Sequence, residues 1–310
     1  MRTSPRRGIF QGVLTLAALA GCATGAHEAH FSADVLAAQM QRRPVVLLGE
    51  IHDNAEQHAV RAQALALLLR TGLRPALAFE QFDRQVQPDI DRVLAQAPAA
   101  GVDPVGQLVA LGDPRWNWKR YRPFLELALQ YRLPIVAANL SRGDAMRVSK
   151  EGFGAVFDPA EQQRLGLDPL PSDLLLAQQQ EVDQGHCHQM PEQMLPALAR
   201  AQIARDASLA QAILPYLQTG VVLLTGNGHV RRDIGVPHYL PAQERQRVIS
   251  IALVEHDEAE DSVPAGAYDA VFRTPVQQRA DPCQLLRRTA SLQSSALVVI
   301  FSPLQIRAHS

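Results

Sequence analysis

The chain of 310 residues has no excess of charge of one sign, few aromatic residues, few cysteines and no long hydrophobic run, and these features limit the classes of protein to which it can belong. Charge of one sign is not in excess, because 30 Lys and Arg residues face 31 Asp and Glu residues and leave a formal net charge of -1. This balance, without a basic stripe interleaved with aromatic residues, argues against nucleic-acid binding. Aromatic residues make up only 5% of the chain, yet 47% of its residues are hydrophobic, which is enough for a large buried core.

Long hydrophobic runs are also missing, since the apolar stretch at residues 9–20 is shorter than the roughly 20 residues of a membrane span. Three arginines precede this stretch, which is typical of a signal peptide. It ends in Leu-Ala-Gly-Cys and resembles a bacterial lipobox. We therefore expect residues 1–21 to be a lipoprotein signal peptide and Cys22 to be lipidated. Because Ala23 and not aspartate follows, we expect a lipid anchor in the outer membrane, on its periplasmic or surface face. An ordinary secretory signal with a chance cysteine is the alternative.

Cysteine is scarce, with three residues in the whole chain. If Cys22 is lipidated, Cys187 and Cys283 remain, in a compartment that permits disulfides. Two cysteines so far apart in sequence are weak support for a bridge, so we interpret them as unpaired thiols and keep the bridge as the alternative.

Short apolar runs rich in Val, Ile and Leu recur along the chain, and they do not alternate with polar residues. Such runs predict a parallel sheet covered on both faces. Residues 55–70 carry a helical apolar stripe after a capping Asn54, so the first two runs form a βαβ unit. The runs lie at residues 44–48, 75–79, 133–138, 220–224, 248–254 and 296–301.

The predicted fold class is α/β, with a mostly parallel sheet flanked by helices and a smaller helical subdomain inserted. The subdomain is inferred from two segments without strand-like runs, residues 84–130 and 143–215. The remaining assignments are a tether at 22–41, an α/β core at 42–83 with 131–142 and 216–280, and a C-terminal extension or last strand at 281–310.

Polar residues follow nearly every predicted strand, and in an open α/β sheet the ligand crevice lies outside the carboxyl ends of the strands. This rim comprises Glu50, His52 and Asp53 after the first strand, Glu80 and Gln81 after the second, Asn139 after the third, Thr225, Asn227 and His229 after the fourth, and Glu255 and His256 after the fifth. Gly49 and Gly226 adjoin it, as a tight turn or a close backbone approach requires.

Glu50, His52, Glu80 and His229 could bind a divalent metal, because mixed carboxylate and imidazole sets do so. They could equally form a structural hydrogen-bond network. The chain has no phosphate loop, no Gly-x-Ser-x-Gly elbow and no His-Glu-x-x-His helix, so the common nucleotide-binding and hydrolase signatures are absent.

Two further clusters carry candidate ligands. His186 and His188 flank a cysteine in "GHCHQMP" and suit a transition metal or haem iron, with local structure as the alternative. The stretch "RWNWKRYRPFLELALQYR" gathers tryptophans and tyrosines with Lys119 and Tyr121. It indicates either a helix that anchors its aromatic residues in the core or part of a pocket for a flat ligand.

Several motifs in order resemble the ChaN-like haem-binding lipoproteins, from a superfamily with erythromycin esterases, Tiki and TraB proteins. They are "VVLLGEIHDN", "ALAFEQFDR", "PIVAANLSR", "HCHQMP" with "RAQIARDASLA", and "LLTGNGHVRRDIGVP", within residues 42–275. The resemblance implies a haem-linked homodimer in which a tyrosine coordinates iron while a histidine and a lysine bind propionates. It suggests Tyr121 and Lys119, with His186 and His188 as further candidates, and an outer-membrane haem receptor as a partner.

The resemblance matches the superfamily motif at the Glu and His rim as well, which leaves two hypotheses. We favour an outer-membrane-anchored haem-binding lipoprotein of haem or iron acquisition, which is not an enzyme. The alternative is a metal-dependent hydrolase of esterase or protease type, with Glu50 or Glu80 as general base beside a metal-bound water.

Overall fold

A computed structural model describes residues 32–284 apart from 98–100, 102, 257–262 and 282. The predicted signal peptide, the lipidation site Cys22 and the apolar run at 296–301 therefore lie outside the described residues. None of the described helices combines the length and the hydrophobicity that a membrane-spanning helix needs.

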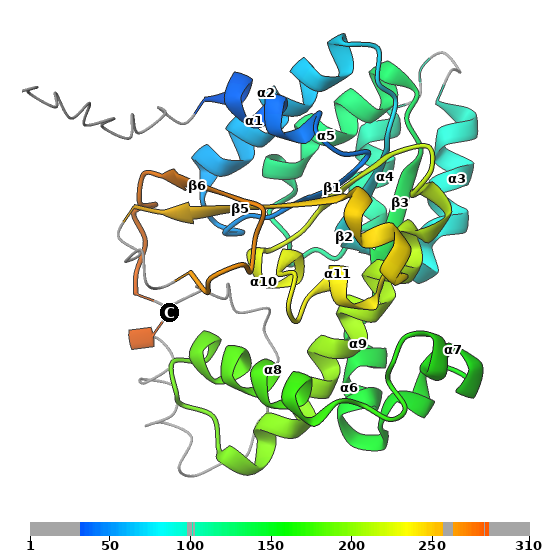
Figure 1. The fold of residues 1–310 in the computed structure, drawn as a ribbon. Helices are drawn as coiled ribbons and strands as arrows, with labels where there is room; N and C mark the ends of the chain where they lie inside the picture. Colours follow the sequence, from blue (N-terminus) through cyan, green and yellow to red (C-terminus); the bar gives the residue numbers. More distant parts are fainter. Residues whose placement is uncertain (1–31, 98–100, 102, 257–262, 282, 285–310) are drawn as a thin grey trace, which may run out of the picture. The chain divides into compact units, whose positions relative to one another are not determined.

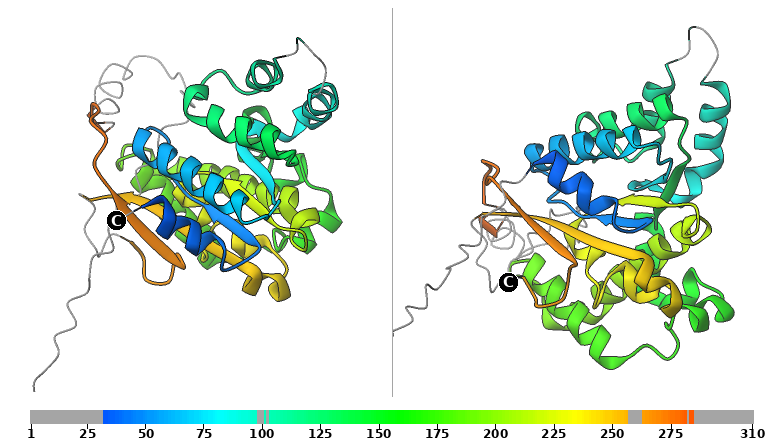
Figure 2. Two further views of the ribbon diagram at one scale, coloured as in Figure 1. Left: turned by 90° about the horizontal axis from the view of Figure 1, so that it is seen from above. Right: turned by 45° about the horizontal axis from the view of Figure 1, so that its top comes forward.

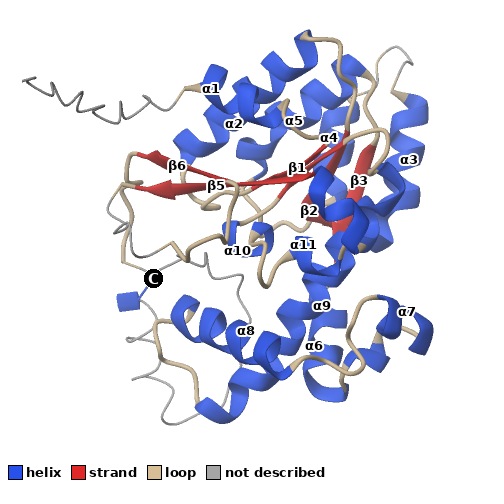
Figure 3. Ribbon diagram, in the orientation of Figure 1, coloured by secondary structure: helices blue, strands red, loops and turns tan. Residues whose placement is uncertain are grey.

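The centre of the fold is one parallel sheet, as the apolar runs predicted (Figures 1 and 3). Its strand order is β3-β2-β4-β1-β5-β6, so β1 lies between β4 and β5, and β4 separates β1 from β2. The strands are β1 (Val45–Leu48), β2 (Ala76–Asp83), β3 (Ile135–Asn139), β4 (Val221–Leu224), β5 (Val248–Glu255) and β6 (Ala270–Thr274). The first five match predicted runs, whereas β6 was not expected, because its residues are only partly buried and carry a weak apolar signal.

Helices cover both faces of the sheet (Figure 2). Side chains such as Leu65 and Phe124 form one apolar layer with Val46 of β1. The helices of this layer are α1 (Ala33–Met40), α2 (Ala55–Arg70), α3 (Gln87–Gln96), α4 (Pro104–Leu111) and α5 (Trp118–Tyr131).

The opposite layer joins Val45 and Leu47 to side chains of later helices such as Ile203. These helices are α6 (Arg142–Glu151), α7 (Pro159–Arg164), α8 (Ser172–Gly185), α9 (Leu195–Ile213), α10 (Asn227–Val230) and α11 (Val236–Tyr239). Short 3-10 helices lie at Arg84–Val86, Phe153–Ala155, Glu192–Met194, Leu214–Tyr216 and Ala242–Arg247.

Residues 84–130 and 143–215 contain helices and loops but no strand where the structure describes them, and they share their buried layers with the strands. The described residues belong to one compact unit. The division into an α/β core and a helical subdomain stays a prediction.

The predicted tether is too long, because its last residues form α1. The Ser32 hydroxyl accepts a hydrogen bond from the Val35 backbone N–H at 3.3 Å and caps this helix. Leu36 and Met40 are buried in the layer that α2 shares with the sheet. The spacing of these apolar residues indicated a helix, but the helix has only eight residues and its signal was easy to overlook.

A disulfide joins Cys187 to Cys283 across 96 residues, so the interpretation as unpaired thiols was wrong. The loop after α8 and the segment after β6 meet only in the folded chain, which brings the two Cα atoms to 5.6 Å.

Candidate functional site

The four residues predicted for a shared site come together at the carboxyl ends of β1, β4 and β2, which are neighbours in the sheet. His52 Nδ1 lies 3.0 Å from Glu50 Oε1, and His52 Nε2 lies 4.0 Å from Glu80 Oε1. His229 Nε2 approaches the same Glu80 oxygen at 3.6 Å. Gly226 adjoins the His52 ring so closely that a β-carbon there would collide with it, which explains this glycine.

Glu50 is buried and surrounded by partners from two helices. The Tyr121 hydroxyl of α5 donates a hydrogen bond to Glu50 Oε1 at 2.5 Å, and the Arg61 guanidinium of α2 forms an ion pair with Oε2. A buried carboxylate needs such compensation, because an unpaired buried charge is costly.

Glu80 lies between the two imidazoles. Its Oε2 accepts hydrogen bonds from the Thr225 hydroxyl at 2.7 Å and the Gly226 backbone N–H at 2.9 Å, so Oε1 is the oxygen that faces His52 and His229. Burial alone would raise the pKa of Glu80, but the charge of His229, with hydrogen bonds from His229 and Thr225, holds that pKa well below its usual value. Glu80 is therefore an anion at neutral pH.

His229 is held by a residue that the sequence did not suggest as part of the site. Its Nδ1 lies 2.7 Å from Oδ1 of Asp206, which is buried on α9. Burial lowers the pKa of His229, but Asp206 and Glu80 outweigh it and raise that pKa to about 10. Asp206 lies within "RAQIARDASLA", one of the family-like motifs, and that was the available signal.

His52 is in the opposite electrostatic situation. Burial lowers its pKa, and the nearby His229 lowers it further, against the opposing effect of Glu80. The Trp116 ring stacks edge-on at 4.8 Å, and the His52 backbone carbonyl accepts a hydrogen bond from Arg120 at 3.0 Å. His52 is therefore a neutral imidazole in a fixed orientation.

These groups line a cavity of about 160 Å³. It is smaller than the roughly 300–1,000 Å³ of pockets for drug-sized ligands, so it is too small to enclose a porphyrin. The lining residues are Glu50, His52, Glu80, Asp83, Asp113, Arg115, Trp116, Asn139, Arg142, Gln178, Glu181, Val182, His186, Leu198, Ala201, Gln202, Arg205, Asp206, Gly226, Asn227, Gly228 and His229.

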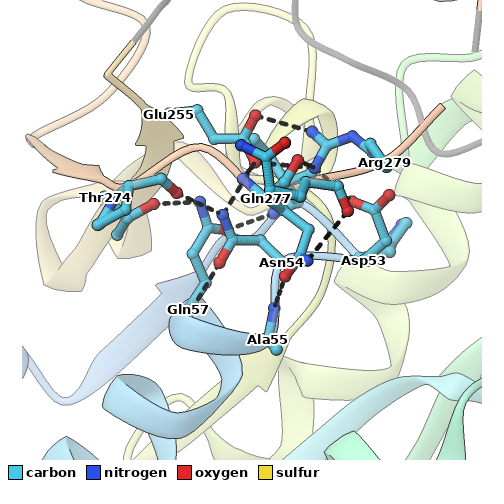
Figure 4. A network of polar contacts seen from close by, with 12 residues as sticks. Asp53, Asn54, Ala55, Gln57, Glu255, Thr274, Gln277 and Arg279 are labelled. Atoms are coloured by element: carbon cyan, nitrogen blue, oxygen red, sulfur yellow. Dashed lines mark hydrogen bonds and ion pairs between the residues drawn. The ribbon is translucent and has the colours of Figure 1, made fainter. Parts of the chain in front are cut away.

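Two of the predicted rim residues, Asp53 and Glu255, do not line this cavity and instead hold the segment after β6 (Figure 4). The Arg279 guanidinium contacts Asp53 Oδ1 at 3.1 Å and Glu255 Oε2 at 2.8 Å. The Asn54 amide donates to Glu255 Oε1 at 2.9 Å and to the Pro275 carbonyl at 3.0 Å. This part of the rim is structural.

The prediction of a divalent metal site at Glu50, His52, Glu80 and His229 is not supported. Within residues 32–284, leaving out the gaps given above, no group of three or more His, Cys, Asp or Glu side chains is arranged to hold a metal ion. The physical reason is that the donor atoms already have protein partners: Glu50 binds Tyr121 and Arg61, and Glu80 Oε2 is hydrogen-bonded to Thr225.

The predicted haem-binding residues lie in different environments. Tyr121 is only 1% exposed and its hydroxyl is bound to Glu50, whereas Lys119 is exposed on the same helix. His186 lines the cavity and donates from Nδ1 to the Val182 carbonyl at 2.7 Å. His188 is exposed, with Nδ1 2.6 Å from Asp183 Oδ2. Coordination of iron by Tyr121 stays a prediction and requires the phenol to leave Glu50.

The protein has an α/β fold, in which helices cover both faces of a parallel sheet. Paired acids and imidazoles lie at the carboxyl ends of its strands. Residues 36–240 match the family described as haem-binding uptake, Tiki superfamily, ChaN, and the chain belongs to this family. No curated protein matches the chain.

One solved structure shares the fold, and two others are similar to a lower degree. The structure described as cofacial heme binding to ChaN of Campylobacter jejuni is 18% identical, with a TM-score of 0.59, over 73% of this chain and 87% of that one. An erythromycin esterase mutant in its open conformation is 13% identical, with a TM-score of 0.43, over 88% of this chain and 86% of that one. A Bacillus cereus protein is 14% identical, with a TM-score of 0.42, over 73% and 70% of the two chains.

Proposed function

We propose that the protein is a haem-binding lipoprotein, anchored in the bacterial outer membrane through Cys22 and active in haem or iron acquisition. The observation that carries this proposal is membership of a haem-binding family over residues 36–240. Haem-dependent dimers and an outer-membrane haem receptor as partner belong to the same proposal.

The haem binds at the surface in this proposal, because the polar cavity cannot enclose a porphyrin. His188 suits the role of axial ligand, since its side chain is 70% exposed and Asp183 holds its Nδ1. A carboxylate on the other ring nitrogen is the usual support of a histidine that ligates a metal, because it fixes the ring and raises its basicity. The Nε2 lone pair is then available to iron.

A groove beside Asp183 offers space for the porphyrin. Its volume is about 460 Å³, and Leu176 of α8 is 56% exposed at its edge. The groove is lined by Leu176, Gln179, Gln180, Asp183, Glu192, Gln193 and Leu195.

Hemin titration of the mature chain tests this proposal. We expect a Soret shift typical of histidine ligation, and haem-promoted dimers in sedimentation. His188→Ala should remove the shift, while His256→Ala, a substitution of another exposed histidine, should leave it intact. A spectrum that never shifts specifically would overturn haem binding. Loss of the shift in Tyr121→Phe with its retention in His188→Ala would assign the iron to the tyrosine instead.

The membrane anchor is tested separately. We expect Cys22→Ala to move the protein from the detergent phase to the aqueous phase in detergent partitioning, since a thioether-linked lipid cannot form. If the variant stays in the detergent phase, the lipoprotein assignment is wrong.

A further inference from the structure

We propose that the amino edge of the sheet is a docking surface for an anionic phospholipid membrane, which it binds through the phosphate groups of the lipid headgroups. The inference rests on the proposed lipid anchor and deepens it, because it states which face of the protein lies against the membrane. The surface comprises an exposed leucine, Leu73, and a set of arginines that we call the basic edge: Arg42, Arg43, Arg70, Arg74 and Arg132.

The topology of the sheet brings these arginines together from separate parts of the sequence. All strand pairs are parallel, so the loops that precede the strands meet at one edge of the sheet. The loops before β1, β2 and β3 follow α1, α2 and α5, which lie in one layer on one face of the sheet (Figure 1). The Arg74 guanidinium lies 4.8 Å from the centre of the Tyr131 ring, so the loop before β2 contacts the end of α5.

The charges of the basic edge are not compensated by nearby acids. The loops at 41–44, 71–75 and 132–134 contain no Asp or Glu. Within the part of the chain that the structure describes, no ion pair joins an arginine of the basic edge to an acid, whereas Arg92 and Arg122 on other surfaces pair with acids at 2.6 and 2.8 Å. Uncompensated guanidinium groups favour a partner with closely spaced anions, and phosphate is a group that arginine binds with two parallel hydrogen bonds.

An exposed apolar side chain lies among these charges and indicates which phosphate-bearing partner fits. Leu73 is 48% exposed in the turn between α2 and β2, and Arg74 donates to the Leu69 and Leu73 carbonyls at 2.8 Å. These hydrogen bonds hold the leucine in place beside the guanidinium. At a membrane surface, a leucine enters the boundary of the acyl chains while basic side chains stay at the headgroups. Nucleic acid offers phosphates but no such apolar layer, so the combination favours a membrane.

The proposed anchor can bring the basic edge to the membrane. α1 has eight residues, so only about 12 Å of helix separates its start from the loop that carries Arg42 and Arg43. The chain between Cys22 and Ser32 spans up to about 30 Å when extended, which is enough to join a lipidated Cys22 to the start of α1 in this orientation. The cavity, which His186 helps to line, lies at the opposite edge of the sheet and faces away from the lipid. The loop that carries His188 therefore stays accessible to haem.

Sedimentation with lipid vesicles tests this surface. The protein is the mature chain with Cys22→Ala, so that no attached lipid contributes, and the vesicles contain phosphatidylglycerol and phosphatidylethanolamine, with phosphatidylcholine as the neutral comparison. We expect binding to the anionic vesicles only, and its loss at about 1 M salt, where the Debye length falls to about 3 Å. Arg42→Gln combined with Arg43→Gln should lower partitioning about 25-fold, because each basic residue near an anionic surface contributes about fivefold, or about 1 kcal/mol.

The matched control is Arg92→Gln combined with Arg122→Gln, which removes the same charge from other surfaces and should leave partitioning nearly unchanged. Leu73→Ser should weaken binding to the anionic vesicles without changing its salt dependence.

Three results would overturn the proposal: equal binding to anionic and neutral vesicles, full binding by the variant without Arg42 and Arg43, or tighter binding to duplex DNA than to vesicles. A loss of thermal stability in that variant with unchanged vesicle binding would assign its arginines to the stability of the helix ends instead. The lipid anchor is tested by detergent partitioning of the lipidated protein, so the two proposals fail independently.

Discussion

Arg61 provides the sharpest test of how the site is built. Its guanidinium is fully buried, forms an ion pair with Glu50 and donates to the Leu48 carbonyl at 2.8 Å. Burial lowers the pKa of Arg61 only to about 10, so it is charged at pH 7. Arg61→Met leaves the Glu50 charge buried without its cation. Breaking a buried ion pair in this way costs about 3–5 kcal/mol of unfolding free energy.

A double-mutant cycle in urea measures whether this cost comes from the pair. Glu50→Gln should also destabilise, because it leaves Arg61 without its anion. The double variant should be more stable than the sum of the two losses predicts, by at least about 2 kcal/mol. The matched control is Arg122→Met in the exposed Arg122–Glu126 pair on α5, where we expect a loss below about 0.5 kcal/mol. Losses at Glu50 and Arg61 that add to within about 0.5 kcal/mol would refute the reasoning.

Three other outcomes follow from the described contacts. Burial lowers the pKa of His58 to about 3, below the unfolded value near 6.5, so stability should fall by about 2 kcal/mol between pH 7.5 and pH 5 and stop falling below pH 3. In His58→Gln, the unfolding free energy measured in urea should depend less on pH over that window. An unchanged pH dependence would contradict this. Cys283→Ser should cost about 4–5 kcal/mol, because the disulfide closes a loop of 96 residues, and reduced wild type should match the variant in thermal unfolding. Leu36→Ala on α1 should lower the unfolding free energy in urea by about 2–5 kcal/mol. A loss near zero would instead support the prediction that residues 22–41 are a tether.

The sheet was predictable because a parallel strand that is buried on both faces has a continuous apolar run in its sequence. β1, buried at each of its four positions, shows this signal clearly. β6 is an edge strand with exposed Val271, so its residues carry no such run and no sequence pattern predicted it. Edge position, not composition, decided that strand.

The sequence by itself determined that acids and histidines would follow the strands, since strand ends are local features. Only the tertiary structure decided which of them would meet. The order of the strands places β4 between β1 and β2, which brings Glu50 and Glu80 to one cavity, while Glu255 at the end of β5 pairs with Arg279 instead. Asp206 joins the site from the middle of α9, and Cys187 meets Cys283, through contacts between segments far apart in the chain. Such contacts depend on how the helices pack on the sheet. Local sequence patterns indicate periodicity and burial, but they do not indicate which distant residue a side chain will contact.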